Sequence, residues 1–168
     1  MGNAHYSRRW PKLSLLLSLT VSFQLLAQTA PEVGVDLSAK RVIFNEGNES
    51  LVSAEKAKPG DTIQYDAVYK NSGNAPVTNV VATVPIPAGL ALTADSAKPV
   101  AEQASLDGKN FGAVPLMREV KNAAGLAEKQ PVPLAQYRAL RWLLPELPPG
   151  HSATVSLRAK VLTNSPTE

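Results

Sequence analysis

The histidines and carboxylates are the side chains of this sequence whose chemistry could support catalysis or metal binding, and they are few. The chain holds two histidines, His5 and His151, and no cysteine. His151 stands alone beside a Pro-Gly turn, whereas a general base needs an oriented partner. We therefore interpret His151 as a surface histidine, and we expect no zinc site because the ligands for one are missing.

The acidic residues suggest two sites, and local pattern argues against both. Asp61 and Asp66 could form a carboxylate pair, but Asp61 lies at a turn and Asp66 is predicted on the outward face of a strand, which favours capping and solvated roles. Glu46 and Glu49 could hold calcium together with loop carbonyls, yet "NEGNES" lacks the alternating aspartates of a known calcium loop. We predict no catalytic, cofactor-binding or metal-binding residue; a pocket joining Asp61, Asp66 or His151 would revive an enzymatic hypothesis.

Two further stretches admit a binding interpretation beside a structural one. "SLDGKNFG" is rich in glycine, but it lacks the Gly-Lys-Ser/Thr ending of a phosphate loop, and a hairpin around Asp107-Gly108 is favoured. Trp142 and Tyr65 could line a carbohydrate site. A tryptophan on such a strand more often fills the core between two sheets, and we predict that position for Trp142.

The net positive charge is concentrated in the first residues of the chain. Seventeen Lys and Arg against fourteen Asp and Glu give a formal charge of +3, and Arg8, Arg9 and Lys12 lie in residues 1–27, which hold no acid. Without that segment the chain is formally neutral, because fourteen basic and fourteen acidic residues remain. A neutral domain has no general attraction for phosphate backbones, so we expect no nucleic-acid partner.

Residues 1–27 have the pattern of a secretory signal peptide. The basic "SRRWPK" precedes an apolar stretch from Leu13 to Ala27, which is shorter than the about 20 residues of a spanning helix. We predict a signal peptide helix at 1–27, cleaved after Ala27 or, as the alternative, after Ala30, and a linker at 28–32. An uncleaved signal would be the only membrane contact. Because the exported chain has no cysteine, packing and not disulfides must hold it together.

The rest of the chain has the pattern of strands separated by Pro- and Gly-containing turns. Alternation of apolar and polar residues predicts strands at 62–70, 77–84, 137–144 and 152–161. A first strand begins at Val33, and its apolar phase slips before Val42, which suggests a bulge or a change of sheet partner. "MREVKNAAGLAEKQ" suggests a short helical turn or a flexible loop within a long central loop region, 94–133.

These elements predict an all-β, Ig-like antiparallel β-sandwich over residues 33–162, with a C-terminal tail at 163–168. "VDLSAKRV" and "PGDTIQYDAVYKNSGNAPVTNVVATVPIPAGLAL", with the closing "LRWLLPELPPGHSATVSLRAKV", resemble the bacterial conserved-repeat domain catalogued as domain of unknown function eleven. The residues that match its pattern in order are Gly60, Asp61, Tyr65, Asn71, Gly73, Asn79, Pro87, Ala88, Gly89, Trp142, Pro149 and Gly150. The family usually has an acid before the Pro-Ala-Gly turn, where this chain has Val84 and Pro85. No ligand role is therefore carried over.

The resemblance implies an Ig-like module on exported or surface-attached bacterial proteins. We therefore expect an exported, non-enzymatic structural or interaction module of the cell envelope, either periplasmic or at the cell surface. Its partner would be another envelope or surface protein, and we expect no cofactor. The alternative is a carbohydrate- or calcium-binding β-sandwich module, which an aromatic patch or an acidic loop cluster would favour.

Overall fold

The structure, a computed structural model, describes residues 33–163, and these form an almost entirely β-stranded fold. The strands are β1 (Val33–Asn45), β2 (Asn48–Ser53), β3 (Thr62–Asn71), β4 (Val81–Pro85), β5 (Leu90–Leu92), β6 (Gln103–Ser105), β7 (Phe111–Ala113), β8 (Met117–Lys121), β9 (Ala127–Pro131), β10 (Ala139–Leu143) and β11 (Ser152–Val161). Two single-turn 3-10 helices, η1 (Ala54–Lys56) and η2 (Leu134–Gln136), lie between strands.

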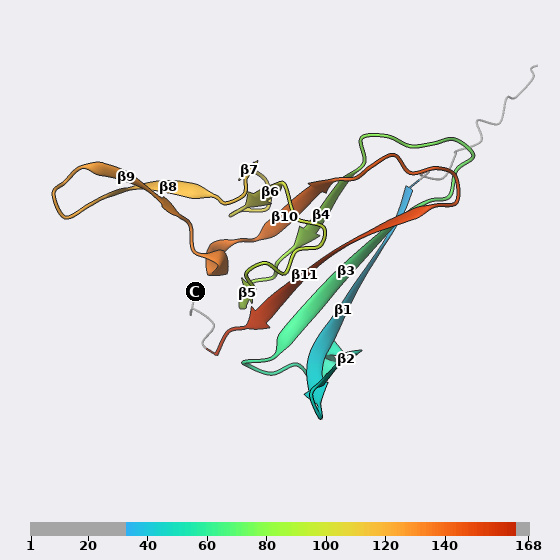
Figure 1. Cartoon of the computed structure of the whole chain (residues 1–168), viewed down its shortest axis with the longest axis horizontal. Helices are drawn as coiled ribbons and strands as arrows, with labels where there is room; N and C mark the ends of the chain where they lie inside the picture. Colours follow the sequence, from blue (N-terminus) through green and yellow to red (C-terminus); the bar gives the residue numbers. More distant parts are fainter. Residues whose placement is uncertain (1–32, 164–168) are drawn as a thin grey trace, which may run out of the picture.

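The strands form two antiparallel sheets that pack face to face, as predicted for a β-sandwich. The larger sheet has the order β2-β1-β3-β11-β5 and the smaller one the order β4-β10-β6-β7. A third, two-stranded sheet contains β8 and β9. Figure 1 shows this β8–β9 hairpin extending away from the two larger sheets.

Period-two alternation places the core between the two sheets. In β11, Val155, Leu157 and Ala159 are buried, while the polar residues between them face outward. Trp142 of β10 fills the space between the sheets, 1% exposed, and its indole N–H donates a 2.7 Å hydrogen bond to the Pro99 carbonyl. A buried indole needs such an acceptor. The predicted core position of Trp142 is confirmed.

A change of partner along β1 explains why the apolar phase of this strand shifts. Its register against β3 runs from Val33 to Val42 without an extra residue, so there is no bulge in this ladder. From Lys40 onward β1 also pairs with β2, which gives its second edge a partner only over Lys40–Asn45. The hairpin turns at Glu46-Gly47, both with positive φ.

The central region is not the loop that the sequence suggested. Residues 94–133 contain β6, β7, β8 and β9. The hairpin predicted around Asp107-Gly108 is present, as β6 and β7. The helical turn or flexible loop expected at 117–130 is wrong, because this stretch is a regular hairpin with Met117 opposite Pro131. Its residues carry little apolar character, and recognising a period of two depends on one buried face.

The N-terminal predictions lie outside the described residues. The predicted signal peptide helix at 1–27 and linker at 28–32 precede Val33, and most of the predicted tail follows Thr163. Within 33–163 no helix has the length and hydrophobicity needed to cross a bilayer. The strands of the predicted domain 33–162 run from Val33 to Val161.

Candidate functional site

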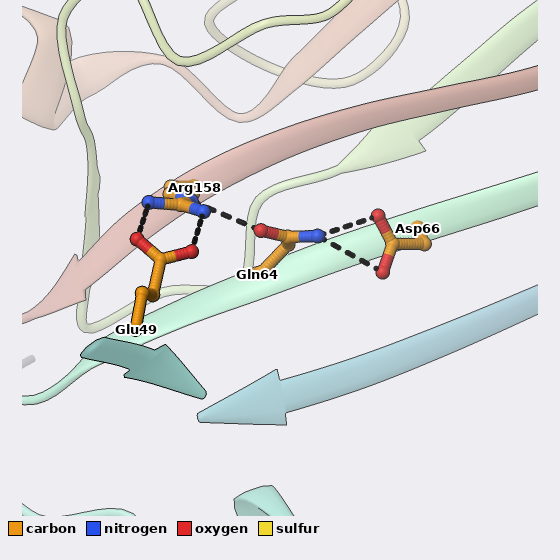
Figure 2. A network of polar contacts seen from close by, with 4 residues as sticks. All are labelled: Glu49, Gln64, Asp66 and Arg158. Carbon is orange, nitrogen blue, oxygen red and sulfur yellow. Dashed lines mark hydrogen bonds and ion pairs between the residues drawn. The ribbon is translucent and has the colours of Figure 1, made fainter. Parts of the chain in front are cut away.

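In the described part of the chain, a network of four connected polar side chains lies on the outer face of the larger sheet, and Figure 2 shows it from close by. The Arg158 guanidinium donates to both carboxylate oxygens of Glu49, at 2.5 and 2.9 Å. Its Nε donates to Gln64 Oε1 at 3.0 Å. The Gln64 amide then donates to both oxygens of Asp66, at 2.9 and 3.2 Å. The four side chains form one continuous chain of hydrogen bonds.

Three strands contribute to this network, and one of them must bend to reach it. Gln64 of β3 and Arg158 of β11 are directly opposite each other in the register. Glu49 belongs to β2, which is separated from β11 by β1 and β3. In a flat sheet that separation would be roughly 14 Å, three strand spacings. The ion pair therefore indicates that the β1–β2 hairpin curls over the outer face.

The one cation of the network, Arg158, is paired with Glu49, and the second carboxylate, Asp66, is bound only by the neutral Gln64 amide. The hydrogen bond from Arg158 lowers the pKa of Glu49 below its ordinary value. A hollow of 370 Å³ beside the network is lined by Gln64, Asp95, Lys98 and Arg158, among others. With its arginine already paired to a carboxylate, this hollow offers no concentrated positive charge to an anion.

The remaining acidic candidates stabilise turns. Asp61 accepts the backbone N–H of Lys58 at 3.0 Å and pairs with Arg41 at 3.2 Å; the first of these bonds contributes most to its lowered pKa. The capping role predicted for Asp61 is confirmed. Asp66 lies on the outer face as predicted, but it is half-buried and bound by Gln64. No hydrogen bond links Asp61 to Asp66 among the described residues.

Asp107 holds the β6–β7 turn together. Its carboxylate accepts the backbone N–H groups of Lys109 and Asn110, both at 2.8 Å, the Asn110 side chain, and the Ser105 hydroxyl. These donors, led by the Asn110 backbone, hold the pKa of Asp107 far below its usual range. The stretch that resembled a phosphate loop therefore folds around its own aspartate.

His151 and the aromatic candidates do not converge on a pocket. His151 is exposed, and its Nδ1 lies 3.1 Å from the Pro149 carbonyl oxygen, as expected for a surface histidine. Trp142 is buried and cannot offer a flat face to a sugar. Tyr65 is half-buried on the inner face, where burial raises the pKa of its hydroxyl. Neither aromatic residue forms the exposed platform that stacking on a carbohydrate would need.

The calcium hypothesis finds no acidic cluster in the described part of the chain. No group of three or more histidine, cysteine or acidic side chains gathers within residues 33–163. Glu49, one of the two proposed ligands, is paired with Arg158. Glu46 lies in the β1–β2 turn with a φ of 51°.

An apolar cleft of 390 Å³ opens beside β5, at the end of the sandwich that holds η2. It is lined mainly by aliphatic side chains, including Leu92, Val100, Val114 and Leu134. Val100 is the most exposed of them, at 81%. Its titratable lining residues are Asp95 and Tyr137, and the Tyr137 hydroxyl already accepts the Leu116 N–H at 2.8 Å, so the cleft offers contact area and no group of catalytic residues.

Two polar contacts were missed by reading the sequence. The Tyr69 hydroxyl bonds the backbone of Thr83, and the Arg141 guanidinium lies 3.4 Å from the centre of the Phe111 ring. Both join segments whose pairing no local pattern indicates. The Gln64–Arg158 contact had a partial signal, since both residues occupy outward positions of predicted strands.

Comparison with known proteins adds no assignment: the chain matches no family model, no curated protein and no solved structure.

Proposed function

We propose that this protein is an exported, non-enzymatic interaction module of the bacterial cell envelope. In this proposal the sandwich is a rigid support, and the β8–β9 hairpin, residues 117–131, is the contact element that it presents to another envelope or surface protein. The signal-like sequence of residues 1–27 supports export. The engagement of the acidic candidates in turns and ion pairs supports a role in binding without catalysis.

The exposure of the β8–β9 hairpin is the observation that carries the proposal. Every residue of β9 is exposed, and in β8 only Val120 is partly covered. A two-stranded hairpin without a packed face is marginally stable in water. A chain that keeps such an element therefore gains stability when a partner covers one of its faces.

The tip of the hairpin nevertheless has a defined shape. The Asn122 side chain accepts the backbone N–H groups of Ala124 and Leu126, both at 3.0 Å. The backbone N–H of Asn122 donates to the Leu126 carbonyl at 2.9 Å. Leu126, 66% exposed, is held in place beside these bonds. An ordered tip with an exposed leucine has a lower entropic cost of binding than a flexible loop.

Deletion of the hairpin tests the proposal. Because the Val132 N–H donates to the Leu116 carbonyl at 2.8 Å, residues 117–131 can be replaced by Asn-Gly, which closes a two-residue turn on this pair without moving the sandwich. The wild-type protein and the deletion variant, each purified after expression of its full chain, are sedimented with outer-membrane, peptidoglycan and soluble periplasmic fractions. Bound material is crosslinked and identified.

We expect saturable recovery of the wild-type protein with one fraction and loss of that recovery in the deletion variant. Lys160→Gln, on the outer face of β11, is the matched control and should bind like the wild type. Wild-type protein that stays in the supernatant with every fraction would refute the docking role. Equal binding of the deletion variant and the wild type would show that the hairpin is not the contact element.

A further inference from the structure

The first half of β1, residues 33–39, is an open sheet edge: its backbone is paired on one side only. This segment pairs with β3 on one side, and no other described segment pairs with its second side. In an antiparallel strand alternate residues direct their N–H and C=O groups to each side, so this edge offers a row of unused donors and acceptors. Its sequence, VGVDLSA, contains one charge and no proline.

Two other edges of the same fold are closed or carry charges, and β5 and β7, at the ends of the two sheets, are only three residues long. On the free side of β4, the Tyr69 hydroxyl accepts the Thr83 N–H at 3.0 Å and donates to the Thr83 carbonyl at 3.4 Å. Pro85, the last residue of β4, has no N–H to offer. The β8–β9 hairpin carries five charged side chains in ten strand residues. Charges and prolines are the devices by which proteins keep edges from pairing, and the β1 edge has only Asp36.

The same segment leaves apolar side chains uncovered. Val35 and Leu37 are opposite Tyr69 and Ala67, so they lie on the face of the larger sheet that carries the core. They remain 56% and 46% exposed. The smaller sheet contacts the larger one where β4 lies near β3 and β11, and β1 lies outside the part of the larger sheet that these contacts cover. In Figure 1, β1 lies far from the β8–β9 hairpin, so that hairpin of the same molecule does not shield it.

We propose that the β1 edge pairs antiparallel with the β1 edge of a second copy of this chain, forming a two-fold symmetric dimer with one continuous sheet. The edge is complementary to itself. With Val35 opposite Val35 of the other copy, Val33 lies opposite Leu37 and Gly34 opposite Asp36. With Leu37 at the centre, Val35 lies opposite Ala39 and Asp36 opposite Ser38. Both registers join apolar side chains on one face and keep the two aspartates from facing each other.

The register centred on Asp36 is excluded by the same reasoning, because it places two like charges directly opposite each other. The dimer is independent of the contact role proposed for the β8–β9 hairpin. Either can fail without the other, because the two elements are separate and their tests measure different things.

Sedimentation across about 1 to 100 µM, a range suited to a small interface, measures the dimer directly. We expect a concentration-dependent dimer of the wild-type protein, purified after expression of the full chain. Val35→Lys should weaken association by about tenfold or more, because an inward-facing lysine protects a sheet edge. The control Leu143→Lys replaces a residue of similar exposure on the smaller sheet and should leave the dimer intact. Thermal unfolding of each variant establishes that it is folded.

Single-cysteine variants then locate the interface, since the chain has no cysteine of its own. Opposite residues of an antiparallel pair lie about 4.5–5.5 Å apart at Cα, within disulfide range. Val35→Cys or Leu37→Cys should form a disulfide-linked dimer under mild oxidation, and Val100→Cys, on an exposed loop, should not.

Three results would overturn the inference. One is a monomer at every concentration. Another is a dimer that Val35→Lys leaves unchanged and that neither cysteine captures. The third is a monomer whose recovery with an envelope fraction is lost in Val35→Lys, which would assign the edge to a strand of another protein.

Discussion

Asn71 is a buried polar residue that joins three segments of the chain. Its amide NH2 donates to the carbonyls of Ala75 and Leu147, both at 2.8 Å, and its Oδ1 accepts the Gly73 N–H at 2.9 Å. The side chain is 0% exposed, so none of these groups can turn to water instead. We expect Asn71→Ala to lower the free energy of unfolding by about 2–3 kcal/mol, because buried partners are left unsatisfied. Urea denaturation measures the loss.

Asn71→Asp distinguishes hydrogen bonding from packing at this position. The carboxylate keeps the shape but faces two carbonyl oxygens with an acceptor, so this variant should be less stable than Asn71→Ala. Asn74→Ala, an exposed residue of the same turn, should stay within about 0.5 kcal/mol of the wild type. Equal stability of Asn71→Asp and the wild type would contradict the role assigned to the amide.

The loss of stability at low pH also depends on single residues, namely three carboxyl groups. The pKa values of Glu49, Asp61 and Asp107 are lowered by hydrogen bonds in the folded protein, from ordinary values of 4.5, 3.8 and 3.8. A carboxyl whose folded pKa is depressed stabilises the fold above its unfolded pKa, and this contribution is lost as the pH falls through the folded pKa. We therefore expect stability to be constant near neutral pH and to fall below about pH 4.

Asp107 tests that expectation because its pKa is lowered furthest. The difference in stability between the wild type and Asp107→Asn should be largest at neutral pH and shrink as the pH falls below the ordinary value of 3.8. Glu128→Gln on the exposed hairpin serves as the control. Urea titrations at a series of pH values would count against the assignment if the Asp107→Asn difference did not change with pH.

Reading the sequence identified residues whose roles depend on their own neighbours. Two of the residues that match the family pattern are examples: Gly89 adopts a φ of 83°, which glycine takes without strain, and Asn71 bonds the turn that follows it. The ion pair between Glu49 and Arg158 joins residues 109 positions apart. A local sequence pattern cannot indicate a contact between residues so far apart in the chain. The same limit hid the Tyr69 cap on β4, because it depends on how the two sheets are placed.

At the scale of elements, the Glu49–Arg158 pair fastens the β1–β2 hairpin to the face of the sheet. An exposed ion pair contributes little to global stability, but it holds an element that would otherwise move more freely. We expect Arg158→Gln to raise hydrogen exchange at the amides of β2 and to leave the central amides of β3 protected. Hydrogen exchange followed by mass spectrometry resolves the two strands.

The matched control for this prediction is Lys160→Gln, on the same face of β11 and outside the network. Glu49→Gln should also raise exchange in β2, and the double variant should raise it no further than Arg158→Gln, because Arg158→Gln already removes the ion pair together with the bond to Gln64. Unchanged exchange in β2 would mean that hairpin packing, and not the ion pair, fixes its position.

The predicted elements succeeded where one face of a strand is buried. β3, β10 and β11 alternate because their inward residues contact the second sheet, so their period is visible in the sequence. β6 and β7 have three residues each, too few to establish a period. β8 and β9 have no buried face, so their residues are mostly polar and show no alternation of apolar and polar positions. The segment 94–133 was therefore predicted as a long loop region with one small hairpin, although it holds four strands.

At the scale of the whole molecule, association depends on which sheet edges are open. The Tyr69 hydroxyl closes β4 by bonding both backbone groups of Thr83, whereas the first half of β1 remains open. One open edge with a two-fold axis gives a closed dimer, and two open edges allow growth without limit. A single side chain therefore keeps β4 from acting as a second pairing edge beside β1.

Tyr69→Phe removes this closure with the smallest possible change. We expect it to lower the free energy of unfolding by about 1–2 kcal/mol, since the Thr83 N–H and carbonyl lose their partner. We also expect species larger than a dimer in sedimentation velocity, because β4 becomes a second pairing edge. Tyr65→Phe is the matched control: no hydrogen bond from the Tyr65 hydroxyl exists among the described residues, so association should not change.

The double variant Tyr69→Phe, Val35→Lys separates the two edges. With β1 blocked, β4 is the one edge that the variant opens, and pairing of β4 with β4 of a second copy should stop at a dimer. Large species that persist in the double variant would show aggregation from loss of stability and not edge pairing. A Tyr69→Phe protein that is less stable yet no larger than the wild type would mean that Pro85 alone is enough to keep β4 from pairing.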